Sequence, residues 1–464
     1  MIRLPIVALV LLSLVVGAGP ARSAGAEGKA GAEWKAGVAA VKITPQTSMP
    51  MAGYAARKKP SEGVALDLYA KALAVEDAGG HRLVVVTCDL IGVPRALRDK
   101  VEKRVLEKHR LPPACLVVNA SHTHCGPELR VERLAENRVG EEQQRAGADY
   151  VAGLEERLVA LVGRALAQLA PARLDYLHAR AGFAMNRRRP TARGFTNAPY
   201  SDGPVDHDVP VLRVSDPQGK LRAVMFGYAC HNTTLPYYKF CGDYAGFAQQ
   251  YLQEDLPGVT ALFVAGCGAD QNPYPRGTEE RARQHGRTLA TAVEAALETV
   301  PRPLGGPLVS AAEEVAIDFA PPPAREELQK IAAGKREPDA GHARRLLEEL
   351  DTSGKIRTSY PYRIQVVRSG DDLVLVALAG EVVVDYSLRL KRELAGPAVW
   401  IAGYCNDVFG YVPSLRVLKE GGYEAGEATK YGPLPGPFAA SIEERIIAGV
   451  KRVNKGATHP SQPK

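Results

Sequence analysis

The sequence predicts a single large α/β domain with a mixed β-sheet core and flanking helices. Apolar runs of strand length alternate with amphipathic helical segments along most of the 464 residues. Short Gly- and Asp-rich turns at 78–80 and 369–372 join neighbouring strands into hairpins, which argues against a regular barrel. No linker divides the chain, and 45% hydrophobic with 24% charged residues is a globular composition that can bury a sizeable core.

Each element is expected for a local reason. Strands are assigned to short apolar runs that end at turn-forming residues. Helices are assigned where apolar side chains recur three and four residues apart, as Val101 and Val105 do, with Leu106 on the same face. Gly242 and Asp243 resemble an N-cap. Strands are expected at 38–43, 66–75, 81–88, 114–118, 173–184, 209–214, 223–226, 260–265, 362–367, 373–378 and 398–403, and helices at 95–109, 150–170, 244–256, 279–297 and 441–453.

The N-terminal residues 1–24 are typical of a cleaved signal peptide. Arg3 supplies a positive start, and the apolar run 6–16 is too short to span a bilayer as a helix. Small residues between 21 and 26 offer a cleavage site, and no Cys lies there to carry a lipoprotein anchor. We therefore expect an exported protein, secreted or periplasmic, without a transmembrane segment.

The remaining chain divides by composition. Residues 25–35 are expected to be a flexible lead, and 36–453 to form the folded domain. The stretch 321–351 begins with prolines and is then highly charged, which predicts a helical excursion on the surface. Residues 454–464 are expected to be a tail.

Two histidines, His122 and His124, form the most informative motif of the chain. They follow the apolar run 114–118 and precede a Gly-Pro turn, so they lie where a strand ends. Ligands and reactive groups collect at such positions in α/β sheets. Residues two apart in an extended segment share a face, so one imidazole is expected to bind a metal while the other faces what the metal holds. The pair alone is equally consistent with an ordinary polar loop.

Three more apolar runs end in polar side chains that suit a metal ion. Together with the His pair, these four strand ends favour a real metal site over coincidence. The side chains are His231 after 223–226, Glu381 after 373–380, and Asn406, Asp407 and Tyr411 after 398–403.

Charge and cysteine content narrow the functional classes. The net charge is +7, but Lys and Arg are scattered apart from the run 187–189, and no basic stripe suggests nucleic acid. An exported protein could oxidise some of its seven cysteines, and the odd number leaves at least one unpaired within the chain. Thiolates could bind zinc, but no Cys-x-x-Cys pair supports a structural zinc site, and several cysteines are expected to be small buried residues.

The block from Ser121 to Pro127, Ser-His-Thr-His-Cys-Gly-Pro, is highly specific, and weaker motifs follow it in a fixed order. Together they resemble the catalytic domain of the neutral/alkaline, non-lysosomal ceramidase family over about residues 36–450. The weaker motifs are 36–38 with 43–45, 88–90, Asn186-Arg187, 203–206, Cys230-His231, Gly380-Glu381, 411–413 and 422–424.

The resemblance implies one zinc ion per chain, held by His122, His231, Glu381 and Tyr411. The tyrosine ligand comes from the family and does not follow from spacing. Zinc lowers the pKa of bound water from roughly 15.7 to about 7, and the resulting hydroxide would attack an amide carbonyl.

The resemblance also assigns catalytic roles. His124 would act as general acid/base or oxyanion donor, and Arg187 and Tyr423 would contact the substrate and its oxyanion. Asn186 would help bind substrate, and Arg187 is preferred over its arginine neighbours because it directly follows Asn186. Arg187 could equally be a solvated arginine, and Tyr423 could pack within a Gly-rich loop.

Two departures from the family pattern bear on the substrate. The family carries Gly-Asp-x-Ser-Pro-Asn, whereas residues 268–273 place Gln271 at the position of that active-site Ser. Glutamine is no nucleophile, but it can hydrogen-bond an acyl or head group, so a zinc-hydroxide mechanism survives the change. The resemblance also stops where those enzymes continue into an immunoglobulin-like domain, so features that help to engage a membrane lipid are expected to be missing.

Three functional hypotheses follow. The first is an exported zinc-dependent amidohydrolase that cleaves N-acylsphingosine or a related N-acyl amine, with at most transient contact with a membrane surface. The second is a divergent metal-dependent amidase or esterase for a small polar substrate, which Gln271 favours. The third, a non-catalytic binding protein, is disfavoured because it would have no chemical need for His122, His124, His231, Glu381 and Tyr411.

Overall fold

The computed structural model describes residues 34–136, 139–394, 396 and 398–458. The predicted signal peptide lies outside these residues. The helices are α1 (Arg95–His109), α2 (Val131–Glu136), α3 (Glu141–Ala167), α4 (Asp243–Asp255), α5 (Glu279–Leu297), α6 (Arg325–Ala332), α7 (Glu337–Ser353), α8 (Val384–Glu393), α9 (Leu415–Glu420) and α10 (Ile442–Thr458), with 3-10 helices η1 (Pro113–Cys115) and η2 (Glu427–Tyr431).

The strands form four sheets in the described chain. The large sheet has the order β10-β9-β8-β5-β1-β2-β3-β4 with β12 beside β5, and smaller sheets have the orders β11-β6-β7, β13-β14-β15-β17 and β16-β18. Parallel pairs (β3 with β4, β9 with β10, β15 with β17) occur beside antiparallel ones, which confirms the predicted mixed α/β fold. The strands are β1 (Trp34–Lys42), β2 (Tyr69–Glu76), β3 (Arg82–Cys88), β4 (Leu116–Ala120), β5 (Ala170–Arg180), β6 (Ala184–Thr191), β7 (Gly194–Tyr200), β8 (Asp208–Ser215), β9 (Leu221–Tyr228), β10 (Thr260–Ala265), β11 (Gln271–Pro273), β12 (Arg302–Pro303), β13 (Leu308–Asp318), β14 (Ser359–Ser369), β15 (Leu373–Leu378), β16 (Glu381–Val382), β17 (Ala398–Ala402) and β18 (Tyr411–Val412).

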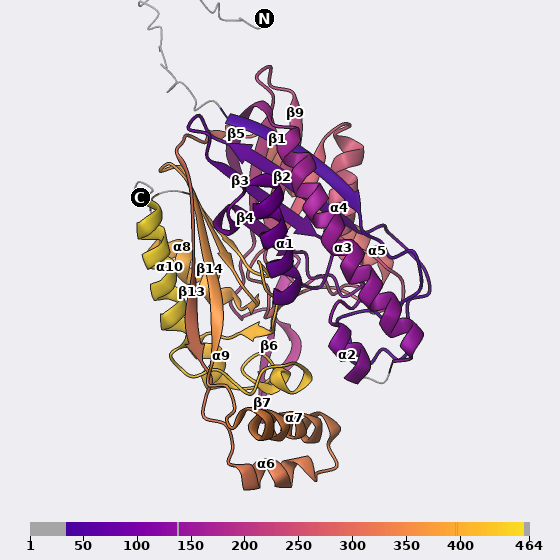
Figure 1. Ribbon diagram of the computed structural model, residues 1–464. Coiled ribbons are helices and arrows are strands. Elements are labelled where there is room, and N and C mark those ends of the chain that lie inside the picture. The colour runs from indigo at the N-terminus through magenta and orange to yellow at the C-terminus, as the bar shows by residue number, and fades with distance from the viewer. Residues whose placement is uncertain (1–33, 137–138, 395, 397, 459–464) are drawn as a thin grey trace, which may run out of the picture. The chain divides into compact units, whose positions relative to one another are not determined.

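The two larger sheets pack face to face between two layers of helices (Figure 1). Alternate residues of β2 show why: Ala72 faces the cluster under α1 and α3, whereas Leu73 faces the second sheet, where Leu375 and Trp400 belong to the same cluster. Helices α4 and α5 cover β8–β10, and α8 and α10 cover the far face of the second sheet. Because most strands are buried on both faces, they read in the sequence as continuous apolar runs.

The side chain of Asn119 joins the ends of strands from both sheets. Its Oδ1 accepts a hydrogen bond from the backbone of Ala265 in β10 (2.9 Å), and its Nδ2 donates to the carbonyl of Gly403 after β17 (2.8 Å). The backbone of Asn406 also donates to the carbonyl of Val118 in β4 (2.7 Å). The ends of β4, β10 and β17 are therefore held together at one place.

Several predicted elements differ from the observed ones. Helix α3 begins at Glu141, nine residues before the predicted start, because its first two turns are polar and carry no apolar periodicity. Leu106 is 42% exposed and does not lie on the buried face of α1. Strands β6, β7 and β13 and helix α8 were not predicted, since β6 and β7 are polar segments whose extended form depends on pairing with each other.

The ends of the domain extend slightly beyond the predicted bounds. Strand β1 begins at Trp34, inside the predicted lead, and α10 continues to Thr458, inside the predicted tail. The stretch 321–351 contains α6 and α7, which pack on each other through Leu328, Ala343 and Leu346. Among the described residues, no helix is both long and apolar enough to cross a membrane.

We predict that Asn119→Ala lowers the free energy of unfolding by about 3 kcal/mol, because two buried backbone groups lose their partner. Urea unfolding followed by circular dichroism measures this. The control is Gln218→Ala at an exposed turn, which should change stability by less than about 0.5 kcal/mol. Equal stability of the two variants would contradict a structural role for Asn119.

Candidate metal centre and active site

Side chains from four strand ends meet at one place. His122 follows β4, His231 follows β9, Glu381 opens β16 and Tyr411 opens β18. Glu381 and Tyr411 are directly paired, because β16 and β18 lie parallel with these residues in register. His122 has a left-handed backbone (φ 62°), which turns the chain sharply after the strand.

Three hydrogen-bond acceptors face one another in this cluster. Nδ1 of His122 contacts the carbonyl of Ile91 (2.6 Å), and Nδ1 of His231 contacts that of Gly268 (2.8 Å). A carbonyl can only accept, so each Nδ1 carries a proton, and in the neutral form of each ring Nε2 presents a lone pair. Both Nε2 atoms lie beside the same Oε2 of Glu381, at 3.2 and 3.3 Å.

A cation fits this arrangement. Oε2 of Glu381 is buried and has no hydrogen-bond donor among the described residues. Lone pairs that face one another repel, and a cation between them would remove the repulsion; Nη1 of Arg187 already lies 3.3 Å from Nε2 of His231. Two imidazoles with a carboxylate form a common metal-binding set. Ligand atoms of His122, His124 and His231 also lie within 4.8 Å of one another. The cluster could therefore hold a metal ion.

The protonation states agree with metal binding. Burial and the nearby Arg187 guanidinium lower the pKa of His231 to about 4, so its imidazole is neutral at neutral pH. Burial opposes ionisation of Glu381, but the imidazoles of His122 and His231 hold the pKa of its carboxyl well below the usual range. The centre thus offers the neutral imidazole of His231 and the carboxylate of Glu381 beside the imidazole of His122.

Tyr411 completes the edge of the cluster and depends on Arg187. Its ring lies parallel to that of His231 at 6.4 Å between centroids, and its hydroxyl accepts a hydrogen bond from Nη2 of Arg187 (3.0 Å). Burial and the Glu381 carboxylate raise the pKa of Tyr411 well above 10, whereas Arg187 opposes that rise. Arg187 also lies 3.3 Å from Nε2 of His231 and is paired with Glu424 (2.8 Å). Arg187 therefore contacts two candidate ligands.

His124 lies beside the candidate ligands with one nitrogen unused. Its Nε2 is 3.2 Å from Nε2 of His122, while its Nδ1 is buried without a hydrogen-bond partner in the described chain. Burial and the imidazoles of His122 and His231 hold the pKa of His124 well below its usual value. The neutral ring is fixed by the edge of Tyr54 and by Gly53, where a Cβ would lie 2.5 Å from the ring.

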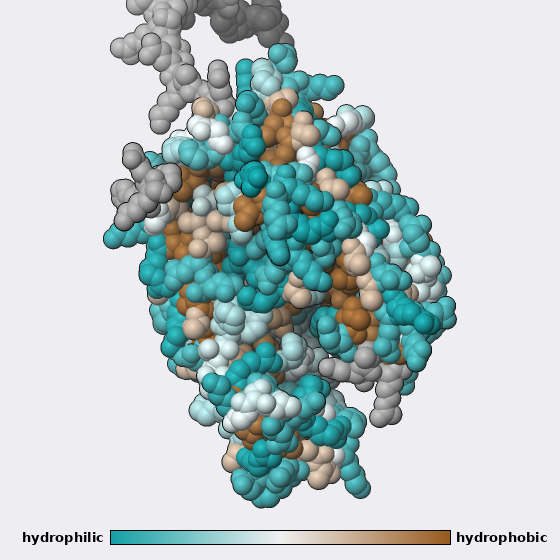
Figure 2. All heavy atoms as spheres, in the orientation of Figure 1, coloured by the Kyte–Doolittle hydropathy of each residue, from teal (hydrophilic) through white to brown (hydrophobic). Residues whose placement is uncertain are grey.

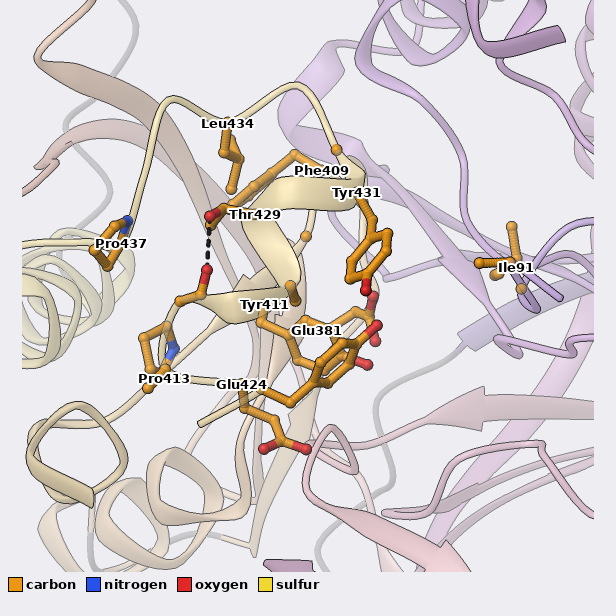
Figure 3. Close-up of a pocket in the computed structure, with 18 of the residues that line it drawn as sticks. Ile91, Glu381, Phe409, Tyr411, Pro413, Glu424, Thr429, Tyr431, Leu434 and Pro437 are labelled. Carbon is orange, nitrogen blue, oxygen red and sulfur yellow. Dashed lines mark hydrogen bonds between the residues drawn. The ribbon is translucent and has the colours of Figure 1, made fainter. Parts of the chain in front are cut away.

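A pocket of about 330 Å³ opens beside this cluster, a volume typical of small-molecule sites. His122, His124, Glu381 and Tyr411 line it, and Tyr423 stands at its side with 40% of its surface exposed. Figure 3 shows how Glu381 and Tyr411 lie near one another while the pocket wall continues over other elements. One part of that wall is apolar and includes Phe409, Pro413, Leu434, Pro437 and Phe438, whereas Arg130, Arg133, Glu424 and Thr429 line other parts.

Gln271 and Asn186 do not reach the pocket. The amide of Gln271 donates to the carbonyl of Ala229 (2.7 Å) and accepts from the backbone of Asp206 (3.0 Å). Asn186 donates to the carbonyl of Pro204 (2.9 Å) and accepts from the backbone of Arg188 (2.9 Å). Both side chains are buried and bond backbone groups of neighbouring segments, so they connect these segments to one another; the predicted substrate contact stays a prediction.

Other predicted candidates lie away from the cluster. Asn406 bonds the backbone of Val118 (3.0 Å), and Asp407 accepts from Tyr360 (2.7 Å). All seven cysteines are free, and none belongs to the metal-competent group. Arg187 is not among the residues that line the pocket; its side chain contacts Tyr411 and His231.

Three residues near the centre were not singled out from the sequence. The ring of Tyr404 lies 4.5 Å from that of His122, and its buried hydroxyl has no partner among the described residues. Glu424 pairs with both Arg187 and Arg188 (2.8 and 2.5 Å). Arg57 donates to the carbonyl of His124 (2.6 Å). Tyr404 follows an apolar run and could have been found by that rule, whereas Arg57 gives no local signal.

This α/β fold with buried imidazoles and a carboxylate at its strand ends defines a protein with a candidate metal centre. Residues 34–271 match the family described as neutral/alkaline non-lysosomal ceramidase, N-terminal, and the chain belongs to this family. It is 26% identical to the neutral ceramidase of Pseudomonas aeruginosa over 236 residues, which are 48% of this chain and 34% of that enzyme. The matched region is thus about a third of the relative's length.

Solved structures agree on the fold. The crystal structure of neutral ceramidase from Pseudomonas aeruginosa superposes with a TM-score of 0.69 at 21% identity, covering 92% of this chain and 74% of that one. A structure described as ceramidase complexed with C2 gives a TM-score of 0.67 at 20% identity, covering 93% and 77%. Unlike the sequence match, these superpositions extend over nearly the whole chain.

We predict that Arg187→Met weakens the binding of Zn²⁺ by about 10- to 100-fold, because Tyr411 and His231 lose the group that orients them. Competition with a chromophoric chelator measures the dissociation constant. Arg189→Met, at an exposed position two residues along β6, is the matched control and should bind as the wild type does. Equal affinity of both variants would show that Arg187 does not support the centre.

Proposed function

We propose that this chain is an exported zinc-dependent hydrolase that cleaves the amide bond of N-acylsphingosine or a related N-acyl amine. Family membership supports an amide-hydrolysing enzyme. The observation that carries the proposal is the convergence of Nε2 of His122, Nε2 of His231 and Oε2 of Glu381 beside a pocket that has a partly apolar wall and is lined by His122 and Glu381. Tyr411 is the fourth proposed ligand.

The residues divide the chemistry among them. Zinc held by this set supplies a Lewis acid that activates water and polarises a carbonyl at neutral pH. His124 lines the pocket as a neutral imidazole, so it can take a proton from the attacking water and return it to the leaving amine. Burial raises the pKa of Tyr423 to about 12, so its hydroxyl stays protonated and can donate to the developing oxyanion.

The pocket favours an acylated amine over a small polar substrate. Its wall of Phe409, Pro437 and Phe438 offers an apolar surface on which an alkyl chain loses contact with water. The sequence argument for a polar substrate rested on Gln271, whose side chain is bonded to backbone groups away from the pocket. A divergent amidase or esterase for small polar substrates therefore remains only as an alternative outcome of the test below.

Export and membrane contact are also part of the proposal. Export rests on residues 1–24, which lie outside the described structure. A lipid amide must leave a membrane or micelle to enter the pocket, so transient contact with a membrane surface accompanies the proposed substrate.

The test is amine release from a panel of substrates that runs from long-chain N-acylsphingosine to short polar amides and esters, with the zinc-loaded full chain. We expect turnover of long-chain N-acyl amines and its loss in His122→Ala. Turnover of short polar substrates alone would select the alternative. Absence of any turnover by the zinc-loaded chain would overturn the proposed activity.

A second prediction concerns His124. We expect Gly53→Ala to lower kcat by at least about tenfold, because the added Cβ would displace the imidazole that handles the proton. Gly194→Ala is the matched control, since Gly194 has a similar φ (108° against 101°) but no atom within 4 Å of the added Cβ. Zinc affinity and melting temperature are measured for both. An unchanged kcat in Gly53→Ala would remove His124 from the proposed proton transfer.

A further inference from the structure

A second cavity of about 1110 Å³ adjoins the pocket at the candidate metal centre. We call it the basic groove. Its walls come from the loop 50–60, from α2 and the start of α3, from α7 and from the loop 430–434. The two cavities share lining residues, so one molecule can occupy both. The shared residues are Gly53, Ala55, Arg130, Arg133, Tyr431, Gly432 and Leu434.

The lining of the groove is strongly cationic. Eight Lys or Arg residues line it, against three Glu. They come from four separate segments of the chain, so the charge is gathered by the fold and not by a run in the sequence. Helix α7 forms one wall, and Figure 2 shows hydrophilic and hydrophobic residues side by side on the surface around it. A concave surface of one sign focuses its electric field and concentrates ions of the opposite sign.

Part of this charge is balanced within the protein. Arg130 pairs with Glu128, Lys59 with Glu62, Lys430 with Asp339, and Arg357 with Glu349. These ion pairs leave little net field near their own positions.

Three other cations have no carboxylate within ion-pair distance in the described part of the chain. The guanidinium of Arg57 donates to the carbonyls of Ala52, His124 and Tyr237 (2.5 to 2.8 Å). Arg345 donates to the carbonyls of Lys430 and Gly432 (3.0 and 3.3 Å). Lys58 is exposed, and among the described residues only its backbone makes a hydrogen bond. Neutral carbonyls satisfy donors but leave the positive charges uncompensated.

The position of these cations indicates which half of an amide substrate, the acyl half or the amine half, would lie near them. An amide with its carbonyl at the metal centre has two arms. Phe409, Pro437 and Phe438 line the pocket but not the groove, so the acyl arm is expected on that side. The amine arm then points past His124 toward Arg57, which is bonded to the His124 carbonyl.

We propose that the basic groove binds an anionic group on the amine half of the substrate. The preferred substrate is then an N-acyl amine with a carboxylate, sulfonate or phosphate on its amine half, in place of a neutral N-acyl amino alcohol. This inference rests on the proposed amidase function and adds the charge of the substrate to it. It also implies that salt weakens the recognition, because exposed charges are screened.

The test compares two amides that differ in one group. N-dodecanoyl taurine carries a sulfonate where N-dodecanoyl ethanolamine carries a hydroxyl, with the same acyl chain and the same two-carbon amine. With the zinc-loaded full chain at low salt, we expect kcat/KM to be at least about tenfold higher for the taurine amide. Raising the salt to about 0.5 M should reduce the ratio severalfold.

Variants locate the effect in the groove. Lys58→Glu should bring the ratio close to one, and Arg345→Gln, which keeps an amide donor for the two carbonyls, should lower it in part. Lys103→Glu on the exposed face of α1 makes the same charge change outside the groove and should leave the ratio as in the wild type. If the ratio falls equally in Lys103→Glu, the preference comes from the net charge of the protein, and the proposed anion binding in the basic groove is wrong.

The failure of this inference and of the proposed function are distinguishable. Equal or faster turnover of the ethanolamine amide overturns the anionic preference and leaves the amidase intact. If neither amide nor N-acylsphingosine is hydrolysed, the amidase function fails. Dissociation constants of the two amides, measured by calorimetry, then test whether the basic groove binds anions. Equal constants contradict anion binding, whereas tighter binding of the taurine amide that is lost in Lys58→Glu supports it.

Discussion

The hydrogen bonds of one buried amide, that of Asn119, hold together the strand ends on which the candidate site depends. Asn119 bonds the last residue of β10 and the residue after β17, and it lies three residues before His122. Separate sheets thereby end at a common place, and the segments that follow them carry His122, Glu381 in β16 and Tyr411 in β18. A shift of either sheet would separate these side chains, because each reaches the centre from a different strand. The double-sheet core, packed on both faces, provides the rigidity that such a convergence requires.

The electrostatics of the centre follow from which groups are satisfied by the protein and which are not. Backbone carbonyls fix the protons of His122 and His231 on Nδ1, so both Nε2 atoms and Oε2 of Glu381 are left as acceptors. A cation is the partner that satisfies all three at once. Behind them, Arg187 links Tyr411 to Glu424 and opposes the rise in the phenol's pKa that burial causes. The arginine thus contacts two candidate ligands of the centre, and the family resemblance predicts a substrate contact for it as well.

The pocket and the basic groove together divide the surroundings of the centre by polarity. One side is lined by aromatic and proline side chains, and the other side by cations that have only carbonyl partners. The amide of a substrate would lie between them, with a different environment for each half. Such a division is a physical basis for substrate choice. It is independent of the metal chemistry, and that chemistry is already suggested by the family relationship. Catalysis and specificity would therefore reside in different residues.

The sequence by itself determined much of the fold and the identity of the central residues. Helices 95–109 and 279–297 and the hairpin at 369–372 were predicted closely, because apolar periodicity and turn residues act locally. The motifs at strand ends led to His122, His231, Glu381 and Tyr411. The tertiary structure decided that Gln271 and Asn186 turn inward, that Arg187 stands behind the centre, and that scattered cations such as Lys58 and Arg345 line one groove. Those features depend on contacts between separate segments of the chain, from 18 positions apart for Asn186 and Pro204 to 224 for Arg187 and Tyr411. Local sequence patterns carry no information about such contacts.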